Sequence, residues 1–225
     1  MTYITLNLSG PLMAWAGPRI DERPMASPIP TASHVTGMIG AALGIRRSDP
    51  DTLQRLQDSL RTAVVIERAG RELIDYQIAR LTTPHMRGPA PMGAGIVMDR
   101  RGGTETLTRQ MLYPYRIDAR MTVVIELDDA RSPVTAEEIV AAIEKPTWSL
   151  RLGRAGCPPD VPIVAELVEG SSLAEAAAGI EGELVYLPAD CVEPQLGDIY
   201  APIYGRRDWS ANRHGGEEIY VVRTA

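Results

Sequence analysis

The sequence predicts an α+β fold in which helices cover one face of an antiparallel sheet. Two stretches, 3–8 and 120–127, alternate apolar and polar residues with the period of a half-buried strand. Three others, 31–44, 50–60 and 135–144, repeat apolar residues at helical spacing after capping residues. The chain has 225 residues, 44% of them hydrophobic and 23% charged, which is typical of one large globular domain or two small ones.

The first two elements are a strand and a helix, separated by a loop. Proline and glycine recur through 16–30, so no regular element is expected there. Thr31 or Ser33 can cap the helix that follows, and Gly44 can end it. Small residues recur along this helix at i, i+3, i+4 and i+7, and they predict a stripe that another backbone approaches closely. The stripe contains Gly37, Gly40, Ala41 and Gly44.

The next elements are a helix and two strands. The helix 50–60 begins after Asp49, a natural N-cap, with proline at its first position. Strands are expected at 63–68 and 72–79, joined by a turn at Ala69–Gly70. These two strands would lead directly into the stretch with the weakest pattern.

A long arm is expected over about 78–118. Residues 80–112 are predicted to be irregular because proline and glycine recur through them. Residues 107–115 are expected to return as an extended segment. A connection of this length is usually functional or mobile.

The remaining elements are short. Thr135 caps the helix 135–144, a short helix is possible near 173–178, and strands are expected at 183–187 and 218–223. The order of elements makes the ferredoxin-like fold a candidate. We expect this domain to span 1–150, with 151–225 forming a glycine loop and a small β-rich C-terminal part.

Several classes of protein are not expected from this composition. No run of about 18 uncharged apolar residues exists, and the first residues lack a basic, apolar leader, so we expect a cytoplasmic protein without a membrane partner. Two cysteines exclude a disulfide framework. His85 and His214 are too far apart in sequence to favour a metal site, and no cofactor motif is present. We therefore predict no metal, no cofactor and no catalytic residue.

The distribution of charge indicates an anionic partner despite the net charge of −6. Residues 1–155 carry 19 Lys and Arg against 17 Asp and Glu, whereas residues 156–225 carry 4 against 12. All basic residues except Lys145 are arginine, whose planar fork suits phosphates and base edges. Arginines interleaved with aromatic rings are typical of single-strand binding, although a solvated mobile loop is the alternative. The arm contains Arg80, Arg87, Arg100, Arg101, Arg109, Tyr113 and Tyr115.

Two other segments could hold phosphate. Ser33 and His34 lie at the start of the glycine-striped helix, where backbone N–H groups attract anions, and simple capping is the alternative. Arg151, Gly153 and Arg154 lie in the loop LRLGRAGCP, which can wrap a phosphate backbone or form an arginine-decorated turn. The loop lacks the spacing of a nucleotide-hydrolysing P-loop.

Five segments together resemble a known family. They are LSGPLMAWAGP, PTASHVTGMIGAALGIRRSD, DYQ at 75–77, YRIDARMTV at 115–123 and LRLGRAGCP. In this combination and order they resemble the Cas-five-type subunits of the type I-E CRISPR surveillance complex, Cascade. The resemblance implies a ferredoxin-like, RRM-related domain with a thumb-like arm, and it adds Arg47 and Thr31 to the candidate RNA-binding residues.

The resemblance also implies a role and a set of partners. It implies a non-catalytic subunit in antiviral defence that grips the 5′ handle of the crRNA and contacts the filament and large subunits, with target DNA met only indirectly. One alternative is a metal-independent endoribonuclease, as in type I-C relatives, which would need a base such as His34 or His85 assisted by Tyr76 or Tyr113. A second alternative is an adaptor that makes no RNA contact.

Overall fold

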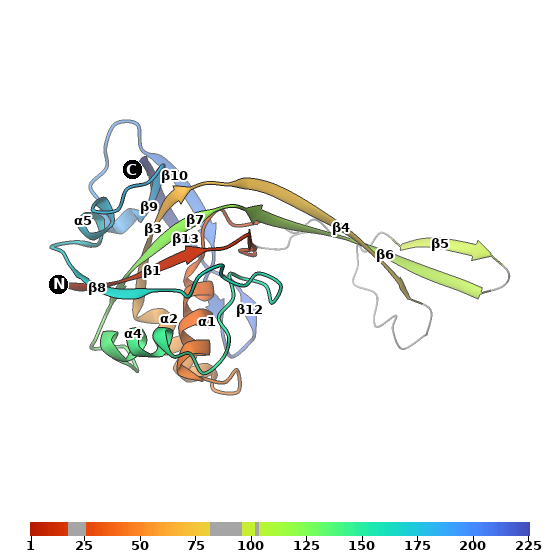
Figure 1. Cartoon of the computed structure of the whole chain (residues 1–225), viewed down its shortest axis with the longest axis horizontal. Coiled ribbons are helices and arrows are strands. Elements are labelled where there is room, and N and C mark those ends of the chain that lie inside the picture. Colours follow the sequence, from red (N-terminus) through yellow and green to blue (C-terminus); the bar gives the residue numbers. More distant parts are fainter. Residues whose placement is uncertain (18–25, 82–95, 102–103) are drawn as a thin grey trace.

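The computed structural model describes residues 1–17, 26–81, 96–101 and 104–225, and only the backbone of 80, 81, 96–101 and 104–109. The chain forms a body and a long arm that projects from it (Figure 1). The body is built on seven antiparallel strands: β1 (Thr2–Ser9), β3 (Leu60–Arg68), β7 (Arg120–Leu127), β8 (Ala165–Glu169), β9 (Leu184–Pro188), β10 (Ile199–Tyr204) and β13 (Glu217–Thr224). Their order across the sheet is β10-β13-β9-β3-β7-β1-β8.

Helices lie on both faces of this sheet. Helices α1 (Ala32–Leu43), α2 (Pro50–Asp58) and α4 (Ala136–Glu144) gather below it in Figure 1, and the short helix α5 (Leu173–Ala178) packs against β3 and β7 away from them. The elements β1, α1, β3, β7, α4 and β8 follow the order β-α-β-β-α-β, with strands arranged β3-β7-β1-β8. This is the element order of the ferredoxin-like motif. The predicted α+β class is confirmed.

The alternating side chains of β1, predicted from the sequence, enter two hydrophobic clusters, one on each face of the sheet. Ile4, Leu6 and Leu8 are fully buried in the large cluster beneath α1 and α4. Tyr3 points to the other face and joins the smaller cluster under α5. Because successive side chains of a strand point to opposite faces, one strand supplies both clusters.

The C-terminal strands extend the sheet of the body at both edges. Strand β8 pairs with β1 at one edge, and β9, β13 and β10 extend the other edge beyond β3. Strands from both sides of residue 150 therefore share one sheet. Within the part of the chain that the structure describes, no helix is long and apolar enough to cross a membrane.

The arm is a β-ribbon. Strand β4 (Arg71–Leu81) pairs antiparallel along its whole length with β6 (Thr104–Ile117), and β5 (Ile96–Arg101) pairs with β6 nearer the tip (Figure 1). The prediction that 80–112 is irregular is wrong for β5 and β6, because β6 pairs with both β4 and β5. Residues 82–95 and 102–103 lie outside the described residues.

The predicted backbone approach to the glycine stripe of α1 occurs only near its C-terminal end, where the N–H of Trp148 donates to the Ala41 carbonyl at 3.2 Å. A Cβ atom at Gly37 would meet only the ring of Trp209, at 3.9 Å, and one at Gly40 would meet a leucine side chain. Gly44 does end the helix as predicted, in the left-handed region at φ 76°. At Gly37 and Gly40 the stripe therefore faces side chains, and the ring at Gly37 belongs to a distant segment of the chain.

Candidate nucleic-acid interface

A groove of about 410 Å³ opens between α1, the segment 147–153 and the hairpin β11–β12 (Arg207–Asp208 and Arg213–His214). All three tryptophans of the chain line it. Three arginines and two histidines also line it, and none of its described lining residues is an Asp or a Glu. The charged and aromatic lining residues are Trp15, Trp148, Trp209, Arg47, Arg151, Arg207, His34 and His214.

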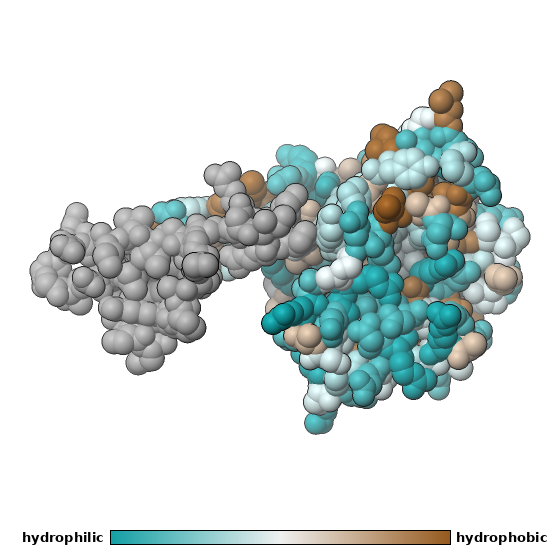
Figure 2. Space-filling view, turned by 180° about the vertical axis from the view of Figure 1, so that it is seen from behind, coloured by the Kyte–Doolittle hydropathy of each residue, from teal (hydrophilic) through white to brown (hydrophobic). Residues whose placement is uncertain are grey.

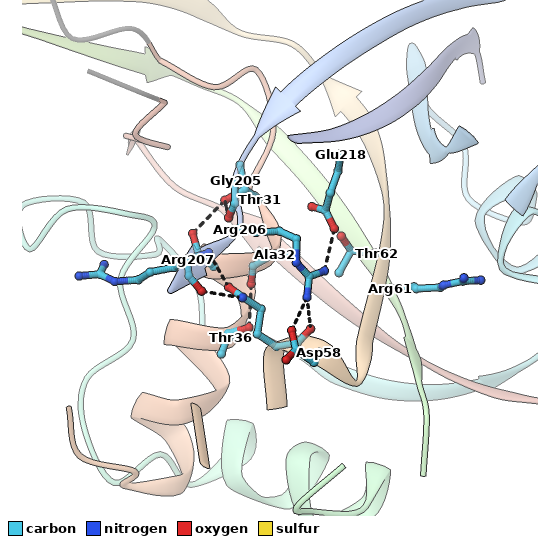
Figure 3. Close-up of polar contacts among 12 residues, drawn as sticks. Thr31, Ala32, Thr36, Asp58, Arg61, Thr62, Gly205, Arg206, Arg207 and Glu218 are labelled. Carbon is cyan, nitrogen blue, oxygen red and sulfur yellow. Dashed lines mark hydrogen bonds and ion pairs between the residues drawn. The ribbon is translucent and has the colours of Figure 1, made fainter. Parts of the chain in front are cut away.

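The start of α1 is occupied by the chain itself. The carbonyl of Gly205 accepts a hydrogen bond from the backbone N–H of Ser33 at 3.0 Å and from the Thr31 hydroxyl at 3.1 Å (Figure 3). Thr31 is fully buried and Ser33 is nearly so. The hydrogen-bonding groups expected to hold a phosphate here thus hold a carbonyl of the C-terminal segment, which favours the capping alternative.

His34 ties this contact to the loop after β1. Its Nε2 accepts the backbone N–H of Ala16 at 3.2 Å, and its Nδ1 accepts the backbone N–H of Thr31 at 3.2 Å and lies 2.7 Å from the Thr31 hydroxyl. Burial, together with the nearby His214 and Arg207, lowers the pKa of His34 to about 4. His34 is therefore neutral at pH 7 and orders the groove wall.

Helix α2 positions the hairpin that carries Arg207. The side-chain amide of Gln57 donates to the Arg207 carbonyl at 2.9 Å and accepts the Arg207 N–H at 3.0 Å. The preceding Arg206 bridges Asp58 at 2.6 Å and Glu218 at 3.1 Å (Figure 3). These contacts fix the C-terminal segment to the helices, so the direction of Arg207 follows from residues about 150 positions earlier.

The groove arginines are not neutralised by carboxylates. The guanidinium of Arg207 lies over the ring of Trp209, 5.1 Å from its centroid. Burial and the proximity of Arg47 lower the pKa of Arg207. Among the described residues, the ion pairs do not include Arg47, Arg151 or Arg207. The groove therefore concentrates positive charge beside indole rings.

The glycine loop is held against the segment after β2 (Leu12–Met13). Ala14 donates its N–H to the Leu152 carbonyl at 3.0 Å, and Gly153 adopts φ 95°. A Cβ at Gly153 would lie 2.1 Å from the Ala14 carbonyl oxygen, so only glycine fits this approach. The glycine brings Arg151 and Arg154 to either side of one tight backbone contact.

Arg154 lies at the root of the arm rather than in the groove. Its guanidinium lies 4.6 Å from the ring centroid of Tyr113 and 5.0 Å from that of Tyr115, both on β6. Tyr115 also lines a second hollow of about 380 Å³, which shares Trp15 with the groove. The two hollows thus lie on either side of Trp15, and a cation–aromatic cluster adjoins one of them.

The structure brings together part of the predicted set. Ser33, His34, Arg47, Arg151 and Gly153 line one groove, and Tyr113, Tyr115 and Arg154 form the cluster at the arm root. The backbones of the following residues lie on the ribbon, and their side chains are outside the description: Arg80, Arg100, Arg101 and Arg109. Arg87 lies outside the described residues.

Sequence reasoning missed five lining residues. Trp15, Trp148, Trp209, Arg207 and His214 come from three segments far apart in the chain. Only the run RRDW at 206–209, which follows a long acidic stretch, offered a local signal. Among the described residues, no three His, Cys, Asp or Glu side chains group closely enough to suggest a metal site.

Comparison with known proteins identifies a family, one relative and two similar structures. A family model described as CRISPR-associated protein (Cas_Cas5) matches residues 3–217. The CRISPR system Cascade subunit CasD of Escherichia coli (strain K12) is 30% identical over 200 residues, which cover 89% of this chain and 81% of that protein. A chain of a CRISPR RNA-guided surveillance complex superposes with a TM-score of 0.63 at 24% identity, covering 99% and 90% of the two chains. A second structure, a Cas protein crystal structure, gives 0.58 at 23%, covering 99% and 93%.

Proposed function

We propose, from the premise that this chain belongs to the CRISPR-associated protein (Cas_Cas5) family, that it is a non-catalytic Cascade subunit that holds the 5′ handle of the crRNA. The observation that carries the proposal is the groove in which unneutralised arginines meet tryptophans. Single-stranded RNA is bound by this combination, since charge follows the phosphates and rings stack on bases.

The open face of the sheet is a poor alternative as the RNA surface. RRM domains stack bases on aromatic side chains that stand exposed on the sheet. Here the corresponding residues of β1, β3 and β7 are covered by α5, and Tyr3 is 1% exposed. The RNA path that we propose therefore runs from the groove, past Gly153, to the cluster of Arg154 with Tyr113 and Tyr115.

The arm extends this path away from the body. Its arginines, predicted to follow the RNA, lie on β4, β5 and β6 or between them. We propose that the ribbon lies along the crRNA and against a filament subunit. Half-exposed apolar side chains on β4 support a protein neighbour there: Leu73, Ile74, Tyr76 and Ile78.

A second apolar surface supports a second protein neighbour. Hydrophobic side chains stand out at the upper end of the body seen from behind (Figure 2). In the C-terminal part of the chain, Leu196, Ile199 and Ile219 are each more than half exposed. We propose that the large subunit covers this end.

The geometry around His34 favours the scaffold over the endoribonuclease. A general base needs a free nitrogen within reach of the substrate hydroxyl. Both nitrogens of His34 are within hydrogen-bonding distance of groups of the chain, Ala16 N–H and the Thr31 hydroxyl. His85 lies outside the described residues.

The test is binding of a labelled crRNA handle to the full chain over a range of salt concentrations. Replacing Arg151 and Arg154 with Ala should weaken binding and flatten the plot of log affinity against log salt by about 1.4, since each single-strand phosphate contact contributes roughly 0.7. A matched control, Arg61→Ala with Arg131→Ala, should leave affinity and slope unchanged. Absence of any handle binding by the wild-type chain and its assembled complex would overturn the proposal.

The wild-type chain and labelled RNA also distinguish the scaffold from the endoribonuclease and the adaptor. Incubation of the wild-type chain with labelled repeat RNA in EDTA should give no cleavage product, and specific cleavage would support the endoribonuclease instead. Crosslinking from a substituted handle nucleotide should reach the groove or the arm root. An assembled complex without any such crosslink would support the adaptor.

A further inference from the structure

We propose that the groove is a pocket for one unstacked nucleotide, whose base lies against the indole rings while its flanking phosphates lie on Arg47, Arg151 and Arg207. The inference rests on the proposed function and names the part of the RNA that this site would take. It separates the chain's RNA contacts into one base-holding site and a longer path that follows only the backbone.

The size of the groove suits a single nucleotide. Its volume of about 410 Å³ lies in the lower part of the range of small-molecule sites, about 300–1,000 Å³. A stacked run of bases would not enter it. Single-stranded RNA is commonly read by splaying one base out of the stack onto aromatic side chains.

The aromatic lining offers surfaces of two kinds. Trp148 is 44% exposed and presents an accessible ring face, whereas Trp15 is 2% exposed and lies edge-on to His34, with ring centroids 5.5 Å apart. Trp209 carries Arg207 over its ring. A base that enters between these elements meets a partly exposed ring at the rim and more buried rings at the wall.

The polar groups of the lining favour a ligand rich in acceptors. The indole N–H groups of Trp15 and Trp209 and the Nε–H of Arg207 are buried without an acceptor among the described residues. All three are donors, and a buried donor left unpaired is destabilising. Base nitrogens, base oxygens and phosphate oxygens would supply the acceptors that these groups lack.

The charges of the lining select a nucleotide over a free base or a peptide. Arg47 lies close enough to Arg207 to disfavour its charge, so an anion between the two guanidinium groups relieves their repulsion. No carboxylate is present among the described lining residues to do so. A nucleotide supplies an aromatic ring and a negative charge in one ligand.

The position of all three tryptophans in the groove makes their fluorescence a direct measure of its occupancy. The experiment uses the full chain and a series of handle RNAs, each lacking one base while keeping its backbone intact. One position should stand out: its loss should weaken binding by roughly 5- to 150-fold and abolish the tryptophan quenching seen with intact RNA. Losses at other positions should leave the quenching in place.

Two variants tie that position to the groove. Trp148→Ala removes a partly exposed ring and is expected to fold normally, and Gly37→Leu fills the space in front of Trp209. In each variant the special position should lose its effect, while the remaining salt-dependent binding persists. If Gly37→Leu does not fold, Trp148→Ala alone still decides.

The outcomes separate this inference from the proposed function. Intact RNA that binds without quenching, and with no position standing out, would overturn the pocket and leave the RNA-binding role standing. A special position that survives Trp148→Ala and Gly37→Leu would place the base elsewhere and also overturn the pocket. Failure of every RNA to bind would instead reject the proposed function.

Discussion

Two hollows of the body have opposite chemistry. The groove of about 410 Å³ is lined by arginines with no carboxylate among its described lining residues, whereas a cleft of about 930 Å³ near the start of α4 is lined by six acids and only two arginines. The larger hollow therefore disfavours an anionic ligand, and the smaller one favours it. Unpaired charge, rather than volume, identifies the candidate nucleic-acid site. The acids of the cleft are Asp58, Glu126, Asp128, Asp129, Glu137 and Glu138.

Several charges of the acidic cleft already have structural roles. Glu138 accepts the N–H of Thr135 and so helps to cap α4, and Asp58 pairs with Arg206. The two arginines of the cleft, Arg61 and Arg131, pair with Asp190 and Asp128. Charges that are paired within the chain stabilise the fold, and those left unpaired are free for a ligand.

The largest expected effect tests the contrast between the two hollows by removing the arginines of the groove. Replacing Arg47, Arg151 and Arg207 together with Ala should weaken handle-RNA binding roughly 100- to 1,000-fold and flatten the salt slope by about 2, because three charged contacts are lost. The measurement is a fluorescence-anisotropy titration at several salt concentrations. Replacing Arg61 and Arg131 of the cleft should change affinity less than twofold. Equal losses in both variants would refute the contrast between the two hollows.

The second effect tests whether the groove also depends on its backbone. Gly153→Ala should lower the free energy of unfolding by about 3 kcal/mol, because Gly153 has φ 95° and its Cβ would collide with the Ala14 carbonyl. Gly156→Ala, three residues later in the same loop, meets no atom within 4 Å and should change stability by less than about 0.5 kcal/mol. Urea unfolding of both variants provides the measurement, and equal midpoints would contradict the packing described.

A third effect follows from the neutral His34. Because its pKa is lowered from 6.5 to about 4, the unfolded chain takes up the proton first as the pH falls. The stability present above pH 6.5 should therefore be lost progressively between about pH 6.5 and pH 4, by up to about 3 kcal/mol. Urea unfolding at pH 7 and pH 5 measures the loss. His34→Gln should reduce this pH dependence, and an unchanged dependence would show that other groups cause it.

The smallest expected effect tests how tightly α1 is packed at Gly37. Gly37→Ala should raise the free energy of unfolding by up to about 1 kcal/mol, because alanine favours the helix and its Cβ only touches Trp209 at 3.9 Å. Gly44→Ala on the same helix should instead destabilise, because Gly44 lies at φ 76° beside Thr147. Thermal melting of the pair distinguishes them. A destabilised Gly37→Ala would mean that the helix does pack tightly at this position.

The fold was predictable where the alternation of apolar and polar residues in the sequence matches the burial of their side chains. The alternation of 3–8 and 120–127 reports which side chains enter the core, and these stretches form β1 and β7. Strand β8 was missed because its side chains are largely exposed and give no such alternation. The ribbon was predicted only in part, because proline and glycine in its sequence masked strands whose stability comes from pairing with each other.

The site was predictable only in part, from the charges of the glycine loop and from the family resemblance. Arg47 and Arg151 were identified as RNA-binding candidates without knowledge of where they would lie. Arg207 and Trp209 were not, because their place depends on hydrogen bonds to Gln57 and Gln54, about 150 residues earlier. Contacts over such a separation leave no periodic signal in the sequence.

The bond from Thr31 to the Gly205 carbonyl has a consequence for the order of biogenesis. The groove is assembled from residues near 15, 150 and 210, so it cannot exist on a growing chain until synthesis has passed residue 214. The basic arm emerges from the ribosome roughly a hundred residues earlier. A nascent chain could thus meet RNA through charge alone, and it would gain the means to hold a particular nucleotide only in its last stage of synthesis.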